Sequence, residues 1–293
     1  MVARKPRLRT VSDDPVRVEY RTVHGYRRAF RVAGDGPPLL LIHGGGDHCR
    51  SWDRLARELR PLFHVVAPDL RGHGDSDWTK GGSYALTAYV YDILRLYETL
   101  GIERASIVGH SMGGMVSLIF SGTYPEKVEK LVVLDGVTVL PDAPRAPTHE
   151  RILKAVAQLK EREGKSPRGY ATIAEGAERM KKRNTRLTDE LALHLAKHAL
   201  KRDENGAYVW KYDKYQRVAA PHRLWPDDHL QLWARISCPT LLLFADRSFL
   251  DNEKRHGLVQ HFPNATAKTI ADSGHWVQHD QPEQVRAEIE TFL

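Results

Sequence analysis

The segment that most constrains the fold of this chain is 109–114, which reads Gly-His-Ser-Met-Gly-Gly. It follows a short apolar run at 105–108 and precedes a stretch whose apolar residues recur at helical spacing. A Gly-x-Ser-x-Gly pattern between a buried strand and a helix predicts a sharp turn that lifts the serine hydroxyl clear of the sheet. The start of the next helix would offer free backbone N–H groups and a positive dipole end, which favour developing negative charge. These features make Ser111 a candidate nucleophile.

The rest of the chain has the rhythm of a parallel α/β sheet. Residues 16–20 and 26–32 alternate as two antiparallel strands would. Apolar runs typical of strands lie at 39–42, 64–67, 105–108, 128–134, 240–244 and 267–270. Helical patterns lie between these strands, at 52–59, 87–100, 112–120, 252–261 and 282–293. Repeated strand–helix units of this kind predict an α/β fold with a mostly parallel, doubly wound sheet.

The strand pattern stops between 137 and 233. Charged helical stretches at 150–163, 173–182 and 188–201 replace it, with a short alternating piece at 208–212. The simplest explanation is an inserted helical cap over 137–233, with the core domain formed by 1–136 and 234–293. An aromatic cluster in the cap either lines a pocket for an apolar group or forms the cap's own small core: Tyr208, Trp210, Tyr212, Tyr215 and Trp225.

Composition limits the classes of partner and the cellular compartment that we expect. A chain of 293 residues with 41% hydrophobic residues suits one large domain with a subdomain. The net charge of +7 does not predict nucleic-acid binding, because the basic residues are interleaved with acids, as at 126–130. The basic start at 1–7 lacks the apolar core of a secretory signal, and no apolar stretch could span a bilayer. Cys49 and Cys238 lack a partner motif. We therefore expect a cytoplasmic protein with no membrane partner, either monomer or homodimer.

Taken together, these motifs resemble those of α/β-hydrolase-fold enzymes with a helical cap. The resemblance runs nearly end to end outside the cap. It is carried by His-Gly-Gly-Gly at 43–46, Asp-Leu-Arg-Gly-His-Gly-Asp-Ser at 69–76, the Ser111 turn, and Ser-Gly-His-Trp at 273–276. These motifs are specific for the fold and much less specific for a substrate.

The resemblance implies a catalytic triad. Ser111 takes the place of the nucleophile, and His275 that of the general base, for which an imidazole is suited because its pKa lies near neutrality. Two aspartates are candidates for the acid. The usual slot, in the turn after the strand at 241–244, falls near Ser248, which is not a carboxylate. We favour Asp135, at the end of the preceding strand, and keep Asp246 as the alternative.

The resemblance also implies an oxyanion hole formed by the backbone N–H groups of Gly45 and Met112. His43 is expected to order this loop. Residues assigned to substrate binding are Gly44, His110, Trp210 and Trp276. No cofactor is expected, and Asp47 with His48 lacks the further ligands that a metal site needs.

The leading hypothesis is a serine hydrolase that cleaves a small to medium carboxylic ester through an acyl-enzyme. The same triad could instead hydrolyse a C–C bond, a lactone or an amide, or carry out perhydrolysis, and a weakly active ligand-binding protein is a further alternative. Haloalkane dehalogenases and soluble epoxide hydrolases resemble this architecture, but they use a carboxylate where this chain has Ser111.

Overall fold

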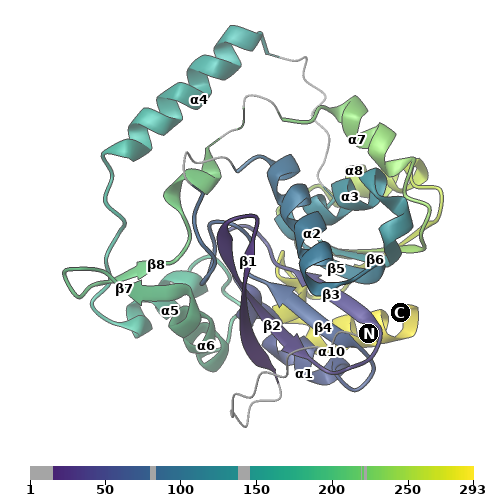
Figure 1. Ribbon diagram of the computed structural model, residues 1–293, viewed down its shortest axis with the longest axis horizontal. Coiled ribbons are helices and arrows are strands. Elements are labelled where there is room, and N and C mark those ends of the chain that lie inside the picture. Colours follow the sequence, from purple (N-terminus) through teal and green to yellow (C-terminus); the bar gives the residue numbers. More distant parts are fainter. Residues whose placement is uncertain (1–15, 80–83, 138–145, 219, 221–222) are drawn as a thin grey trace, which may run out of the picture.

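The computed structural model describes residues 16–79, 84–137, 146–218, 220 and 223–293 (Figure 1). The basic start of the chain lies outside these residues, as does most of the stretch where the predicted cap begins. A single eight-stranded sheet runs through the centre of the molecule, in the order β1-β2-β4-β3-β5-β6-β9-β10. A sheet whose spatial order departs from chain order in this way requires crossover connections, which the helices supply.

The strands closely match the predicted runs. Their bounds are β1 (Arg17–Val23), β2 (Tyr26–Ala33), β3 (Pro38–Ile42), β4 (His64–Pro68), β5 (Ala105–His110), β6 (Val128–Leu134), β9 (Thr240–Ala245) and β10 (Ala265–Ile270). The first two strands pair antiparallel, and β2 pairs antiparallel with β4. All the other pairs in this sheet are parallel. The predicted α/β fold with a mostly parallel sheet is confirmed.

Helices cover both faces of the sheet. Alternate residues of β3 point to opposite sides, so Leu39 and Leu41 join one apolar cluster while Leu40 and Ile42 join the other. The first cluster lies beneath α1 (Asp53–Leu59) and α10 (Pro282–Phe292), and the second beneath α2 (Leu86–Leu100) and α3 (Met112–Thr123). Burial on both faces explains why the central strands are continuous apolar runs.

An insertion separates β6 from β9. It contains α4 (Thr148–Glu163), α5 (Ile173–Lys181), α6 (Asp189–Ala199), the antiparallel pair β7 (Leu200–Arg202) and β8 (Tyr208–Trp210), and α7 (Pro226–Trp233). The helices α5 and α6 share an apolar cluster of their own with this pair of strands. By contrast, α7 packs on α3, and its Trp233 belongs to the cluster of the sheet. The boundaries of a separate cap domain stay a prediction.

Polar contacts fasten the insertion to segments outside it at two places. At the first, Asn184 Nδ2 donates to Asp280 Oδ1 at 3.0 Å. At the second, Lys211 Nζ lies 2.6 Å from Asp75 Oδ1 and the hydroxyl of Tyr84 donates to the carboxylate of Asp213. These contacts hold the insertion over the carboxyl ends of the central strands (Figure 1). In the described ranges, no helix has the length and apolar character needed to cross a membrane.

Candidate active site

Ser111 occupies a tight turn between β5 and α3. Its backbone has φ 51° and ψ −119°, a strained conformation for a non-glycine residue that is common at functional sites. Two glycines make the turn possible. A Cβ at Gly113 would lie 2.2 Å from the carbonyl oxygen of Ile42, and one at Gly109 would lie 2.7 Å from that of Gly113. The close contact of strand, turn and helix therefore requires glycine at both positions.

The structure brings Ser111, His275 and Asp135 together. The hydroxyl of Ser111 lies 2.8 Å from Nε2 of His275, and Nδ1 of His275 lies 2.6 Å from Oδ2 of Asp135. The three residues follow β5, β10 and β6, whose carboxyl ends lie at one edge of the sheet. A hydroxyl, an imidazole and a carboxylate linked in this order can remove the serine proton and stabilise the imidazolium that forms.

The structure does not bring Asp246, the alternative acid, to His275. Its carboxylate accepts backbone N–H groups from Asp272 and Ser273, at 2.9 and 2.8 Å. Asp246 thus fastens the start of the loop that carries His275. It directly follows β9, which ends at Ala245.

The carboxylate of Asp135 has partners that the sequence did not identify. Ser248 Oγ donates to Oδ2 at 2.6 Å, and Arg255 Nη1 donates to Oδ1 at 2.6 Å. The side chains of Asp135 and Arg255 are both 0% exposed. The sequence does give a signal at Ser248, because a serine stands in the slot where the family resemblance places the acid. Arg255 gave no such signal, since an arginine on a short helix is usually a surface residue.

These partners keep Asp135 ionised. Burial alone would raise the pKa of its carboxyl group. The hydrogen bond from His275 and the charge of Arg255 outweigh this effect, with a smaller contribution from Ser248, and lower the pKa to about 2. The group that faces the imidazole is therefore a carboxylate at any ordinary pH.

The predicted oxyanion loop lies against the Ser111 turn. Met112 is the first residue of α3, so its backbone N–H has no acceptor within the helix. A Cβ at Gly44 would lie 3.2 Å from Ser111 Cβ, and one at Gly45 would lie 3.6 Å from the sulfur of Met112. The backbone of 44–45 can therefore approach an atom bonded to the serine oxygen.

His43 orders this loop, as the resemblance implied. Its Nε2 accepts the backbone N–H of Leu70 at 3.0 Å, and its Nδ1 donates to the carbonyl oxygen of Gly44 at 2.7 Å. These roles require a neutral ring. Complete burial, followed by the effect of His73, holds the pKa of His43 well below its ordinary value.

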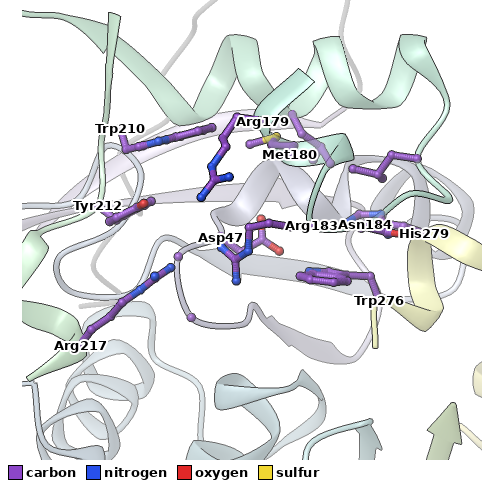
Figure 2. Close-up of a pocket in the computed structure, with 14 residues that line it drawn as sticks. Asp47, Arg179, Met180, Arg183, Asn184, Trp210, Tyr212, Arg217, Trp276 and His279 are labelled. Carbon is purple, nitrogen blue, oxygen red and sulfur yellow. The ribbon is translucent and has the colours of Figure 1, made fainter. Parts of the chain in front are cut away.

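A cavity of about 240 Å³ opens beside this loop (Figure 2). Two of the residues assigned to substrate binding, Trp210 and Trp276, line it together with Gly45 and Gly46. Gly44 is not among the lining residues, since it is buried against Ser111. The predicted aromatic cluster of the insertion divides, because Trp210 and Tyr212 line the cavity whereas Tyr215 packs against the cluster of the sheet.

The structure corrects the assignment of His110 to substrate binding. Its side chain is 1% exposed, and its Nε2 donates to the carbonyl oxygen of His275 at 2.8 Å. Burial and the neighbouring His275 lower the pKa of His110 to about 3, so it is neutral. It supports the backbone of His275 through this hydrogen bond, and its burial keeps it from contacting a ligand.

In the part of the chain that the structure describes, no group of three or more His, Cys, Asp or Glu residues could hold a metal ion. Asp47 and His48 have separate partners. The carboxylate of Asp47 accepts the hydroxyl of Ser51, and Nε2 of His48 lies 3.1 Å from the carbonyl oxygen of Leu195.

Several known proteins are similar to this chain in sequence or in fold. A family model described as the alpha/beta hydrolase fold matches residues 37–282. In curated sequences, an uncharacterized protein of Mycobacterium tuberculosis is 47% identical over 141 residues. That match covers 47% of this chain and 41% of the relative, so it spans less than half of the relative's length.

Two human relatives match along most of their length. Serine hydrolase-like protein 2 is 27% identical over 88% of this chain and 87% of its own, and epoxide hydrolase 4 is 30% identical over 92% and 76%. The crystal structure of a hypothetical protein from Pseudomonas aeruginosa is 29% identical. It covers 93% of this chain and 97% of its own, with a TM-score of 0.83.

Proposed function

Because the chain belongs to the alpha/beta hydrolase fold family, we propose that it is a serine hydrolase that cleaves a small to medium carboxylic ester through a covalent acyl-enzyme on Ser111. One observation carries the proposal. The hydroxyl of Ser111, both nitrogens of His275 and the carboxylate of Asp135 form a continuous hydrogen-bonded chain with contacts of 2.8 and 2.6 Å. We further propose that the partner is a small-molecule ester and that residues 137–233 form a cap over the core domain.

The first half of the proposed reaction is acylation of Ser111. As Ser111 Oγ attacks the ester carbonyl carbon, its proton passes to Nε2 of His275, while Asp135 stabilises the imidazolium from Nδ1. The carbonyl oxygen becomes an oxyanion that the N–H groups of Gly45 and Met112 can hold. Each such donor is worth about 3–4 kcal/mol in the transition state. His275 then returns the proton to the leaving alcohol.

Deacylation repeats these steps with water. Nε2 of His275 takes a proton from a water molecule, which attacks the acyl carbon, and the tetrahedral oxyanion again lies at the backbone N–H groups. Its collapse returns the proton to Ser111 Oγ and releases the carboxylic acid. The sequence of steps uses no group beyond these side chains and the oxyanion loop.

The similarity to an epoxide hydrolase does not favour epoxide opening by this site. A serine oxygen that attacked an epoxide carbon would form an ether, which has no carbonyl group for a water molecule to attack. A carboxylate nucleophile forms an ester at the same step, and water can cleave that ester. With Ser111 at the turn, carbonyl substrates are the class that the site can turn over.

The proposal is tested with a fluorophosphonate probe and an ester series of increasing acyl length. We expect the probe to label Ser111 and the purified protein to hydrolyse short esters. Ser111→Ala should lose the label and about 10³- to 10⁶-fold in turnover. Ser121→Ala, which removes a buried hydroxyl from the same helix, is the matched control and should keep both. Unchanged hydrolysis by Ser111→Ala would overturn the proposal.

The substrate screen also separates the other carbonyl chemistries. Lactones, aryl amides and cleavable diketones are assayed beside the esters with the same two variants. An ester hydrolase should show its highest kcat/KM on an ester, and a clear preference for one of the other classes would replace the ester by that class. Failure of the probe to label the wild-type protein would instead favour a ligand-binding protein.

A further inference from the structure

The cavity beside the oxyanion loop is lined by three arginines that the mechanism does not use. Arg179 lies on α5, Arg183 follows that helix, and Arg217 lies in the turn that precedes α7. Figure 2 shows their side chains entering the cavity from different segments of the insertion. Three positive charges are thus directed at one small space beside the oxyanion loop.

In the described ranges, none of the three guanidinium groups forms an ion pair with a carboxylate. Aromatic rings accompany two of them instead. Arg183 lies over the ring of Trp276 at 5.9 Å, and Arg217 lies over the ring of Tyr212 at 5.5 Å. Such stacking orients a guanidinium while leaving its N–H donors free for another acceptor.

Buried arginines elsewhere in this chain form ion pairs with carboxylates. Arg31 is paired with Asp53, and Arg255 is paired with Asp135, at 3.0 and 2.6 Å. Where the fold needs an arginine for its own stability, it supplies a carboxylate. The cavity arginines lack that counter-charge, so their charge is available to a ligand.

Asp47, the acid that lines the cavity, forms no ion pair with these arginines in the described ranges, and its charge has only a small opposing effect on the pKa of Arg183. The carboxylate of Asp47 accepts hydrogen bonds from the hydroxyl of Ser51 and the backbone N–H of His48. Burial and the charge of Arg217, with a smaller effect of Arg179, lower the pKa of Arg183. An anion placed between them would relieve this repulsion and satisfy their donors.

We propose that this cavity binds an anionic oxygen group of the ester substrate, a carboxylate or a phosphate, through Arg179, Arg183 and Arg217. The inference rests on the proposed hydrolase function and names the class of substrate for that site. Gly45 lines the cavity and belongs to the oxyanion loop, so the anionic group would lie a few bonds from the scissile carbonyl. A volume of about 240 Å³ fits a small group such as a carboxylate or phosphate with its short linker.

The arrangement also gives selectivity. Trp210, Tyr212 and Trp276 form apolar walls, which suit the methylene groups between the ester and the anion. A neutral ester of the same length would leave the arginines solvated and gain nothing from them. A cationic ester would be repelled.

The first test is direct binding, which does not depend on turnover. Monoethyl glutarate, monoethyl 3-phosphonopropionate and the neutral diethyl glutarate are titrated by calorimetry into the Ser111→Ala protein. We expect the charged probes to bind and the neutral diester to bind at least about tenfold more weakly. Adding Arg183→Gln or Arg217→Gln should weaken the charged probes by about tenfold, whereas Arg95→Gln on α2 should not. The stronger of the two charged probes identifies the anionic group as carboxylate or phosphorus oxyanion.

The second test is turnover by the wild-type protein. Monoethyl glutarate and ethyl valerate are compared in a pH-stat, together with the acetate ester of 4-hydroxybutyrate, which carries its charge on the alcohol side. One of the charged esters should exceed ethyl valerate in kcat/KM by about tenfold or more. Arg183→Gln should lower the ratio of the two kcat/KM values by about tenfold, whereas Arg95→Gln should leave both values unchanged. Rescue by Arg183→Lys should be partial, because lysine keeps the charge and loses the bidentate donors.

The two proposals can fail separately. Equal binding of neutral and charged probes, or no change on removing either arginine, would overturn the anion site even if ethyl valerate is hydrolysed and Ser111 is labelled. Conversely, arginine-dependent binding of a charged probe without any labelling of Ser111 would support the anion site and overturn the proposed hydrolase function.

Discussion

Replacement of Asp135 by asparagine should damage this protein through two separate contacts. Oδ2 of Asp135 holds Nδ1 of His275 at 2.6 Å, so Asp135→Asn should lower kcat by about 10⁴, because the imidazole then adopts the wrong tautomer. Oδ1 neutralises Arg255, and both side chains are 0% exposed. Leaving this guanidinium buried without a counter-charge should cost about 3–5 kcal/mol of unfolding free energy. That is a large share of the ~5–15 kcal/mol that stabilises a typical domain.

A second substitution separates the two effects. Arg255→Met removes the buried charge, and the methionine side chain can keep the apolar contact with Phe244, whose ring lies 4.7 Å from the guanidinium carbon. The double variant Asp135→Asn/Arg255→Met should therefore recover most of the lost stability. It should recover none of the lost turnover, because His275 still lacks its carboxylate.

The assay pairs urea unfolding, followed by circular dichroism, with ester hydrolysis under conditions in which every variant is folded. Asp246→Asn is the control, since Asp246 does not contact His275, and its kcat should stay within a few-fold of wild type. If activity returned in parallel with stability in the double variant, Asp135 would act only by holding the fold. The triad reasoning would then be wrong.

Two further predictions concern stability. The pKa of Asp135 is lowered to about 2 from 3.8, so its contribution of about 2 kcal/mol is present above pH ~4 and should be lost as the pH falls toward 2. Urea midpoints between pH 5 and pH 2.5 should therefore fall more steeply for wild type than for Asp135→Asn, and parallel curves would contradict this linkage. Gly113→Ala should lower the melting temperature by several degrees or prevent folding, because its Cβ would lie 2.2 Å from a carbonyl oxygen. The control Gly164→Ala, at an exposed position with no atom within 4 Å of the new Cβ, should change it little, and equal melting temperatures for the two variants would refute the argument.

The sheet could be predicted because its strands are buried on both faces. An apolar run such as 39–42 favours a central strand buried on both faces, and repeated runs of this kind predict a doubly wound sheet. The Ser111 turn was equally predictable, since close backbone contacts demand glycine at 109 and 113. In both cases a strong local constraint appears directly as a residue type.

Features that depend on tertiary contacts could not be predicted in this way. The helix α7 is not among the predicted helical stretches, although it begins at Pro226 and proline is favoured in the first turn of a helix. The predicted helix at 188–201 ends at Ala199, because the next residues pair with β8. The cavity arginines look like ordinary surface charges until the fold brings them together.

The position of the acid shows how two sites on neighbouring strands can serve one imidazole. The strands β6 and β9 are adjacent, and Asp135 N–H donates to the carbonyl oxygen of Leu243 at 2.8 Å. Ser248, in the turn after β9, reaches the same carboxylate oxygen that faces His275, at 2.6 Å. An aspartate at 248 should therefore come within reach of the same imidazole.

This convergence predicts that the acid can be moved. Ser248→Asp alone should lower activity, because two carboxylates would share one site and repel each other. Asp135→Ser alone should lose about 10⁴ in kcat, and the exchange Asp135→Ser/Ser248→Asp should regain at least about tenfold of it, since a carboxylate again faces Nδ1. The three variants are compared on one ester after their folding has been checked by circular dichroism. An exchange variant no more active than Asp135→Ser would show that Arg255 and the positive φ at Asp135 (46°) hold the acid at a place that position 248 cannot reproduce.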